Sequence, residues 1–298
     1  MSSESRAVDR ERSRRSVTSD FVDLTKPRIT LMVLVTTTLG FLTAGGAAGL
    51  PTLGFVLVGV GLLSSGASAL NHVWERETDA LMRRTADRPL PAGRLKSSSA
   101  LVFGVVLSLV GLFALALGVN PLTTMLGALA LTSYVFVYTP LKRMTSLATL
   151  VGAVPGALPP VMGWTAAAAS LGAGAWVLFG ILFLWQLPHT LAIAWLYRED
   201  YARAGFPMLP VIDPDGRSTA RQAVLYGLAL VPVSLLPTVA GLSGATYLIG
   251  ALALGMGFLG SCIAFSMSAT NRTARRLMVV SLLYLPAILV TMLLDRFV

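Results

Sequence analysis

The sequence predicts an all-α integral membrane protein with about nine transmembrane helices. Hydrophobic residues make up 55% of the 298-residue chain and charged residues only 12%, which is about half the charged fraction of a soluble domain. Four long stretches, 29–74, 97–141, 144–197 and 222–271, contain no Lys, Arg, Asp or Glu. Each is much longer than the roughly 20 apolar residues that cross a bilayer once. A polytopic helical fold follows from these observations.

Glycine, proline and short polar segments divide the apolar stretches into individual spans. We expect nine of them, at 29–49, 53–74, 98–118, 121–139, 147–166, 175–196, 220–241, 245–269 and 276–294. The fifth span contains Pro155, Pro159 and Pro160. Proline removes a helical hydrogen bond, so the last third of this span is expected to be kinked or re-entrant.

The basic residues predict the orientation in the membrane. All of the 23 Lys and Arg residues except Arg296 fall in the N-terminal tail or in alternate loops, as the positive-inside rule requires of the cytoplasmic side. An odd number of spans then places the N-terminus inside and the C-terminus outside. This distribution also accounts for the net charge of +9, so no nucleic-acid partner is expected.

Two regions are expected along the chain: a disordered tail at 1–24 and a single transmembrane domain at 25–298. The tail is rich in Arg and Ser, as mitochondrial transit peptides are. It also contains Glu4, Asp9, Glu11 and Asp20, whereas transit peptides are poor in acids. A bacterial cytoplasmic (inner) membrane is therefore favoured over the mitochondrial inner membrane.

Acidic and amide residues form a regular pattern at the end of the second span. Asn71, Glu75 and Asp79 are four residues apart, so in a helix they lie along one face. Their oxygens suit Mg²⁺, which binds one or two carboxylates together with the phosphate oxygens of a substrate. We expect all three to be metal ligands and catalytic residues. The competing interpretation is a solvated helix end at the membrane interface.

A second acidic segment follows the sixth span and is centred on Asp200. Trp74-Glu-Arg-Glu-Thr-Asp79 and Trp195-Leu-Tyr-Arg-Glu-Asp200 are faintly alike, as two four-helix repeats at about 29–139 and 147–269 would explain. Such repeats would place the two segments across a shared central cavity. Asp200 is therefore expected to be a further metal ligand and catalytic residue.

Basic and aromatic residues near these segments are candidate substrate contacts, because guanidinium and ammonium groups bind the oxygens of a diphosphate. The candidates are Arg84, Arg88, Lys142, Arg143, Arg198, Tyr138, Tyr201 and His189. His189 lies within the sixth span, where an ionisable side chain is a functional candidate by default. Tyr201 fits an interfacial aromatic belt equally well. His72 is a weaker candidate because it lies on a different helix face from the acidic stripe.

Four segments resemble a known family. Asn71-x3-Glu75-x3-Asp79 followed by Met82-x-Arg84-Thr85-x2-Arg88-Pro89-Leu90 resembles the first acidic motif of the UbiA superfamily of intramembrane prenyltransferases. The other three are similar to the members of that superfamily that farnesylate haem, and the likeness extends from about residue 20 to the end. They are Tyr138-Thr-Pro-Leu-Lys-Arg143, Gly152-Ala-Val-Pro-Gly-Ala-Leu-Pro-Pro-Val-Met-Gly-Trp164, and Pro188-His189 leading to Tyr197-Arg-Glu-Asp-Tyr-Ala-Arg-Ala-Gly-Phe-Pro-Met-Leu-Pro210.

Two positions depart from the family pattern. Glu75 stands where bacterial relatives often have Asp, which is a conservative change. Ala204 stands four residues after Asp200, where other members of the superfamily have the second acid of an Asp-x3-Asp motif. The binding of a second Mg²⁺ is therefore left open.

The resemblance implies a UbiA-type bundle around a central cavity, with the active site facing the cytoplasm. It implies transfer of farnesyl from farnesyl diphosphate to the 2-vinyl group of haem B with addition of water, giving haem O and diphosphate. One or two Mg²⁺ ions would serve as cofactor, and a terminal oxidase or haem A synthase machinery would be the further partners. The alternatives are a UbiA-type enzyme for a quinone precursor or chlorophyllide, a secondary transporter, and a non-catalytic assembly factor.

Overall fold

The computed structural model describes residues 16–45 and 48–295, and these residues form helices without any β-strand. In chain order the helices are α2 (Val17–Leu24), α3 (Pro27–Thr43), α4 (Gly49–Trp74), α5 (Arg76–Leu81), α6 (Ser97–Gly118), α7 (Pro121–Thr132), the π-helix η1 (Ser133–Tyr138), α8 (Thr139–Leu141), α9 (Ala148–Ala168), α10 (Ala173–Leu196), α11 (Arg198–Arg203), α12 (Leu209–Ile212), α13 (Arg217–Val239), α14 (Ala245–Met267) and α15 (Asn271–Leu294).

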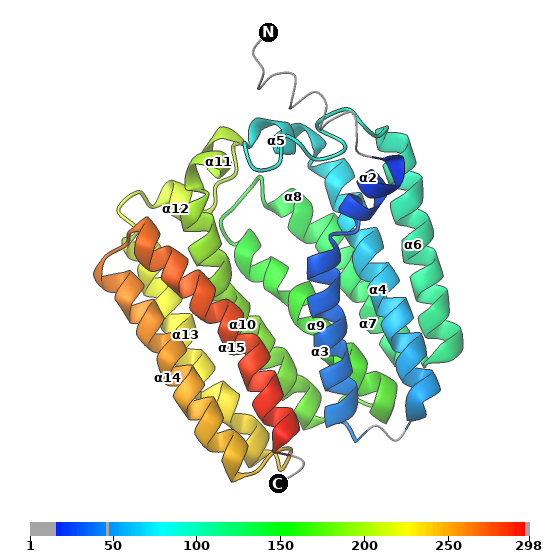
Figure 1. Ribbon diagram of the computed structural model, residues 1–298, viewed down its shortest axis with the longest axis vertical. Coiled ribbons are helices and arrows are strands. Elements are labelled where there is room, and N and C mark those ends of the chain that lie inside the picture. Colours follow the sequence, from blue (N-terminus) through cyan, green and yellow to red (C-terminus); the bar gives the residue numbers. More distant parts are fainter. Residues whose placement is uncertain (1–15, 46–47, 296–298) are drawn as a thin grey trace.

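Eight helical segments of the described chain are long and apolar enough to cross a membrane, with α7, η1 and α8 forming one of them. The first expected span, α3, is apolar but only 17 residues long, or about 25 Å at 1.5 Å per residue. It lies alongside the longer helices (Figure 1). The all-α membrane class is thus confirmed, and the orientation stays a prediction.

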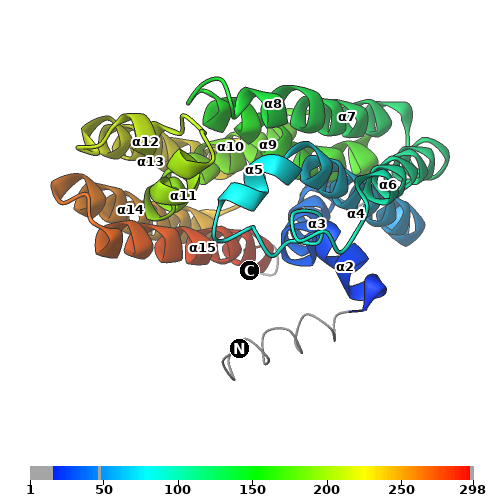
Figure 2. The same cartoon turned by 90° about the horizontal axis from the view of Figure 1, so that it is seen from above.

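The helices form two groups that meet at α9. On one side lie α3, α4, α6 and α7, and on the other α10, α13, α14 and α15 (Figures 1 and 2). Small residues allow the close approach of helices that lipid-embedded packing depends on. A Cβ added to Gly163 of α9 would collide with the Thr37 carbonyl of α3, and one added to Gly40 would collide with the Pro160 carbonyl.

The proline-rich helix α9 is continuous over all 21 of its residues, with Pro155, Pro159 and Pro160 inside it. The expectation of a re-entrant segment is therefore wrong. It is the most buried of the candidate spans, packed against α3, α7 and α10. Carbonyls that proline leaves unbonded are tolerated at membrane depth where protein rather than lipid surrounds them.

The N-terminal tail is shorter than the sequence predicted. Residues 17–24 form helix α2, capped by the Ser16 hydroxyl, which accepts from the Ser19 amide. Leu24 is fully buried against α4 and α6, and Asp20 accepts a 2.9 Å bond from Arg94 Nε. Residues 1–15, the rest of the expected disordered tail, lie outside the described residues.

The two acidic segments lie at the same end of the bundle. Helices α5 and α11 sit side by side there, while the C-terminal end of α15 is at the opposite end (Figures 1 and 2). The backbone amide of Arg84, just after α5, donates to Asp200 Oδ2 in α11 at 3.4 Å. The fold thus joins segments 116 residues apart, as the expected repeats require; the duplication itself stays a prediction.

Candidate functional site

Asn71, Glu75 and Asp79 form a buried stripe at the junction of α4 and α5. The Glu75 amide donates to the Asn71 carbonyl at 2.9 Å and the Asp79 amide to the Glu75 carbonyl at 2.7 Å, so helical phasing continues across the junction. The three residues are 1%, 5% and 0% exposed. The alternative of a solvated helix end is therefore wrong.

Each member of the stripe has a basic partner from a different segment of the chain. Lys26 Nζ donates to Asn71 Oδ1 at 2.9 Å. Lys142 Nζ lies 2.7 Å from Glu75 Oε1, and Arg88 Nη1 lies 2.6 Å from Asp79 Oδ2. Buried charges are stable only when they are paired and hydrogen-bonded, so these three contacts fix the geometry of the stripe.

The environment moves the pKa values of these groups in different directions. Burial opposes ionisation of Glu75, but Lys142 and Lys26 outweigh it and hold the pKa of that carboxyl below its ordinary value. Burial dominates at Asp79 and raises its pKa despite the contact with Arg88. Burial and the nearby Arg88 guanidinium lower the pKa of Lys26 to about 7. A charge-rich site is thus held in a dry part of the protein.

One carboxylate oxygen of the stripe is left without a partner. Asp79 Oδ1 is buried and accepts no hydrogen bond from the described residues. Buried polar atoms are nearly always satisfied, so an oxygen without a partner points to the binding of an ion or ligand. Carboxylate and carboxamide oxygens are the ligands that Mg²⁺ prefers, and the stripe therefore fits the ion. Within the described residues, His, Cys, Asp and Glu side chains form no cluster of three or more that could hold a metal by themselves.

Lys26 is a site residue that sequence reasoning missed. In the sequence it is one of the basic residues that predict the orientation, yet its side chain reaches the stripe. Its backbone has φ = 47°, in the left-handed region, although it directly precedes Pro27, where extended backbone is usual. Strain of this kind persists where surrounding structure imposes it, commonly at functional sites. The signal available in the sequence was a lysine directly before the first span.

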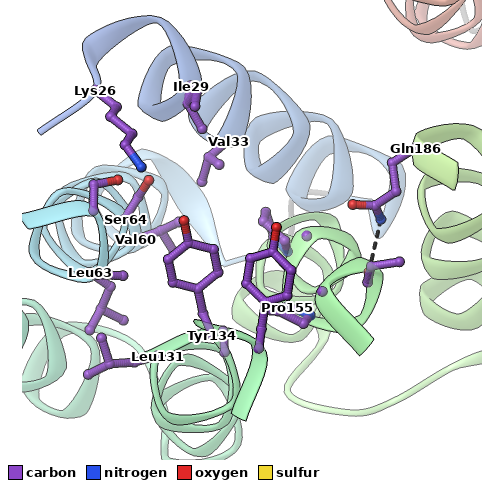
Figure 3. Close-up of a pocket in the computed structure, with 18 of the residues that line it drawn as sticks. Lys26, Ile29, Val33, Val60, Leu63, Ser64, Leu131, Tyr134, Pro155 and Gln186 are labelled. Atoms are coloured by element: carbon purple, nitrogen blue, oxygen red, sulfur yellow. Dashed lines mark hydrogen bonds between the residues drawn. The ribbon is translucent and has the colours of Figure 1, made fainter. Parts of the chain in front are cut away.

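Two hollows meet at Lys26. The inner one is a cavity of about 290 Å³ within the bundle, lined by α3, α4, α7, η1, α9 and α10. Its walls are mainly apolar and include Val33, Leu63 and Leu131, while Tyr134 points its hydroxyl into the space below Lys26 (Figure 3). Tyr138 lines the same cavity and lies 4.7 Å below the Lys142 ammonium, a cation–π contact. Tyr134 and Tyr138 are the aromatic residues of its lining.

The outer hollow is a pocket of about 290 Å³ at the charged end of the bundle. Lys26 belongs to its lining as well, and the other charged or ionisable lining residues are Arg84, Arg88, His72, Asp23 and Asp87. The guanidinium of Arg84 is placed over the Tyr197 ring, 4.9 Å from its centroid. A basic pocket and an apolar cavity thus share a single lysine.

His72 is the second residue that sequence reasoning undervalued. It is 2% exposed, and neither ring nitrogen has a hydrogen-bond partner among the described residues. It lines the basic pocket beside Lys26 and Arg88. The acidic stripe lies along one face of α4, and the pocket also borders the neighbouring face, on which His72 lies.

Asp200 links the two acidic segments. One carboxylate oxygen is paired with Arg203, and the other accepts from the Arg84 amide at 3.4 Å. Both oxygens therefore have partners, unlike those of Asp79. In this arrangement Asp200 holds the Arg84 amide, and its role as a metal ligand stays a prediction.

Three predicted substrate contacts lie away from the basic pocket. Arg143 is exposed and donates to the Trp74 carbonyl at 3.5 Å, on a groove lined also by Arg76. Arg198 bonds Asn271 Oδ1 at 2.9 Å and stacks over Trp195. Tyr201 packs on Phe206 in an apolar cluster below α11. Residues on one membrane face need not share one pocket, and the role of these three as substrate contacts stays a prediction.

His189 is separate from both hollows and bonds to α15. Its Nδ1 lies 2.7 Å from Ser281 Oγ, and its ring stacks on that of Trp185 with centroids 5.2 Å apart. Gln186 and Thr190, its neighbours on α10, line the apolar cavity. His189 therefore occupies the adjoining face of the same helix.

Similarity to known proteins identifies the family to which this chain belongs. Residues 33–286 match the model of the UbiA prenyltransferase family. The chain belongs to the UbiA prenyltransferase family. Curated relatives named protoheme IX farnesyltransferase include one from Solibacter usitatus, 53% identical over 93% of this chain and 98% of the relative. Another, from Salinibacter ruber, is 46% identical over 93% of this chain and 99% of the relative.

Solved structures of UbiA proteins share the fold. A structure concerned with digeranylgeranylglyceryl phosphate synthase has a TM-score of 0.79 at 16% identity, covering 93% of this chain and 98% of that one. A UbiA homologue from Archaeoglobus fulgidus bound to GPP and Mg²⁺ has a TM-score of 0.60 at 13% identity, covering 92% of this chain and 99% of that one. At these identities the likeness confirms the UbiA fold alone.

Proposed function

We propose that this UbiA protein transfers a farnesyl group from farnesyl diphosphate to the 2-vinyl group of haem B, with addition of water, and releases diphosphate and haem O. The observation that supports a prenyl diphosphate as substrate is that Lys26 lines both a basic pocket and an apolar cavity. A prenyl diphosphate has a charged head and an apolar chain that match the two hollows in order. The acceptor is supported by relatives 40–53% identical over nearly their full length, all named protoheme IX farnesyltransferase.

The head group would lie among Lys26, Arg84, Arg88 and His72 in the basic pocket. These side chains come from the α2–α3 junction, from α4 and from the loop after α5, so the pocket is held by three segments. Donors that are fixed before the reaction stabilise charge as it develops without further reorganisation. As the allylic C–O bond breaks, its electron pair passes to the diphosphate, and these donors would take up that charge.

Asn71, Glu75 and Asp79 would hold Mg²⁺. The unpartnered Asp79 Oδ1 is the oxygen most directly available, and the basic partners of the three residues would exchange to the phosphate oxygens. The bound ion would supply Lewis-acid stabilisation of the leaving diphosphate. Whether one or two ions bind is open, because both oxygens of Asp200 are already engaged.

The farnesyl chain would occupy the apolar cavity, with its reactive carbon near Tyr134 and Tyr138. Aromatic faces stabilise a nearby cation, and mainly apolar walls limit early capture by water. The vinyl π electrons would form the new C–C bond to the farnesyl C1. Water would then add to the resulting cation on the haem substituent and lose a proton.

The acidic segments and the loops that carry positive charge lie at one end of the bundle, which we propose to face the cytoplasm across a bacterial inner membrane. The clustering of carboxylates at this end favours an enzyme over a transporter, whose site would lie near mid-membrane.

The test is an assay of the full chain in lipid nanodiscs with farnesyl diphosphate, haem B and Mg²⁺. Formation of haem O, measured by mass spectrometry, is expected, with loss of turnover in Glu75→Gln and Asp79→Asn. Prenylation of a quinone precursor or of chlorophyllide, with none of haem B, would replace the proposed acceptor. Equal haem O formation by wild type and both variants would show that the stripe is not the active site.

A further inference from the structure

We propose that His189 Nε2 is an axial ligand of the haem iron when the acceptor binds. The inference rests on the proposed function for the identity of the acceptor, and on the surroundings of His189 for the position of the iron. It adds a binding site for the porphyrin metal, outside the basic pocket and the apolar cavity, on the face of α10 that meets α15.

Counting hydrogen-bond donors fixes the tautomer of His189. Ser281 Oγ lies 2.6 Å from the Met278 carbonyl and donates to it. A hydroxyl has one proton, so this hydroxyl cannot also donate to His189 Nδ1, 2.7 Å away. His189 must therefore donate from Nδ1, and its Nε2 has a free lone pair. That is the form in which a neutral imidazole binds a metal, with its other N–H held by an outer partner.

The ring is also held in orientation. It stacks on Trp185 with an interplanar angle of 14°, and Trp185 Nε1 donates to the carbonyl of the same Ser281 at 2.8 Å. The rings of Trp185 and His189 are thus both anchored to Ser281 of α15. Such support fixes a ligand against rotation, and residues that orient a metal-binding His are worth about 10- to 100-fold in metal affinity.

Nε2 is free in the structure and open to a ligand. Nδ1 accounts for the only hydrogen bond of this side chain among the described residues, and Nε2 is absent from the buried atoms that lack a partner. His72 differs in this respect, because both of its nitrogens are buried. An ionisable side chain within a span that reaches an accessible surface calls for a functional explanation.

The position also suits the reaction. Gln186 and Thr190, three residues before and one residue after His189, line the apolar cavity. A porphyrin held at His189 would therefore have its edge toward the cavity that receives the farnesyl chain. Imidazole is a normal ligand of haem iron, and the imidazole of His72 in the basic pocket is fully buried.

The experiment uses the ferrous haem–NO complex of the full chain in nanodiscs, because its electron paramagnetic resonance spectrum shows whether an imidazole nitrogen lies trans to NO. The chain contains only two histidines, so His189→Gly and His72→Gly test every candidate. We expect the six-coordinate imidazole signature in wild type and in His72→Gly, its loss in His189→Gly, and its return when imidazole is added to His189→Gly.

A wild-type signature in His189→Gly, or a five-coordinate spectrum in wild type, would overturn the proposal. Ser281→Ala gives a second variant, expected to weaken haem affinity about 10-fold or more with the imidazole signature retained. Size-exclusion profiles confirm that the variants fold, and binding of farnesyl diphosphate is a second control for the variants of His189 and Ser281. Imidazole ligation without haem O formation would contradict the proposed function only, and haem O formation without ligation would contradict this inference only.

Discussion

The ammonium of Lys142 lies 2.7 Å from the carboxylate of Glu75, so the end of the fourth expected span is joined to the end of the second by a buried ion pair. Removal of one partner leaves an unpaired charge, whereas removal of both leaves none. Glu75→Gln is expected to destabilise the protein by about 3 kcal/mol, and Glu75→Gln/Lys142→Met should recover much of that loss. Thermal unfolding in detergent measures the stability. In the proposed mechanism Glu75 holds Mg²⁺ and Lys142 turns to the phosphate oxygens, so neither variant should make haem O. Restored activity in the double variant would mean that the pair is only structural.

Asp79→Asn is expected to abolish metal-dependent turnover while the bundle stays folded. The substitution keeps the size of the side chain and removes the charge of the buried oxygen that has no partner. Turnover should fall at least 100-fold, as expected when transition-state charge stabilisation is lost, and chelation of Mg²⁺ in wild type should have a similar effect. Mass spectrometry of haem O with and without a chelator measures both, and chelator-insensitive wild-type turnover would contradict the metal site.

Asp200→Asn should behave differently from Asp79→Asn. Because the oxygens of Asp200 contact Arg203 and the Arg84 amide, the variant loosens the link between α11 and the loop after α5. We expect a KM for farnesyl diphosphate raised by about 10-fold with the Mg²⁺ concentration dependence unchanged, by the loss of roughly one charge-assisted hydrogen bond. A shifted Mg²⁺ dependence would instead identify Asp200 as a ligand.

His72 should contribute a hydrogen bond to the diphosphate head. His72→Leu fills the space without a donor and is expected to raise the KM for farnesyl diphosphate about 10-fold, the value of one hydrogen bond to a charged group. His72→Gln retains a donor and should lie closer to wild type. Equal kinetics in both variants and wild type would show that the buried ring does not touch the substrate.

Lys26→Met should separate the lysine's charge from its bulk. The variant keeps most of the side-chain volume next to the cavity but cannot bind phosphate oxygens or Asn71. We expect a loss of diphosphate affinity of at least 10-fold, measured by competition of inorganic diphosphate with farnesyl diphosphate. Arg143→Met is the matched control, because this exposed cation lies on a separate groove, and it should leave the competition unchanged.

The sequence was most informative where chemistry and helical geometry coincide. The four-residue spacing of Asn71, Glu75 and Asp79 predicted one helix face, and the structure shows that face buried and paired. The apolar stretches likewise predicted the membrane class. Such inferences hold because a helix relates spacing directly to direction.

The remaining errors concern contacts between segments far apart in sequence. Arg88 and Arg143 are equivalent as basic loop residues, yet one binds Asp79 and the other lies on an outer groove. Lys26 approaches Asn71 across 45 residues, and nothing local reveals that contact. Helix α2 was missed because it is only eight residues long and contains two acids, although Leu24 is buried completely. Periodicity shows which face of a helix is special, and only tertiary packing shows what that face meets.

The shared position of Lys26 also sets the depth at which chemistry can occur. An amphiphile whose head lies on one side of this residue and whose tail lies on the other has a single alignment, and the carbon that bears the leaving group then lies at the level of the lysine. The acceptor must bring its vinyl group to the same level. Selection among flat, membrane-soluble acceptors would thus depend on how high in the bilayer each one can present its reactive edge.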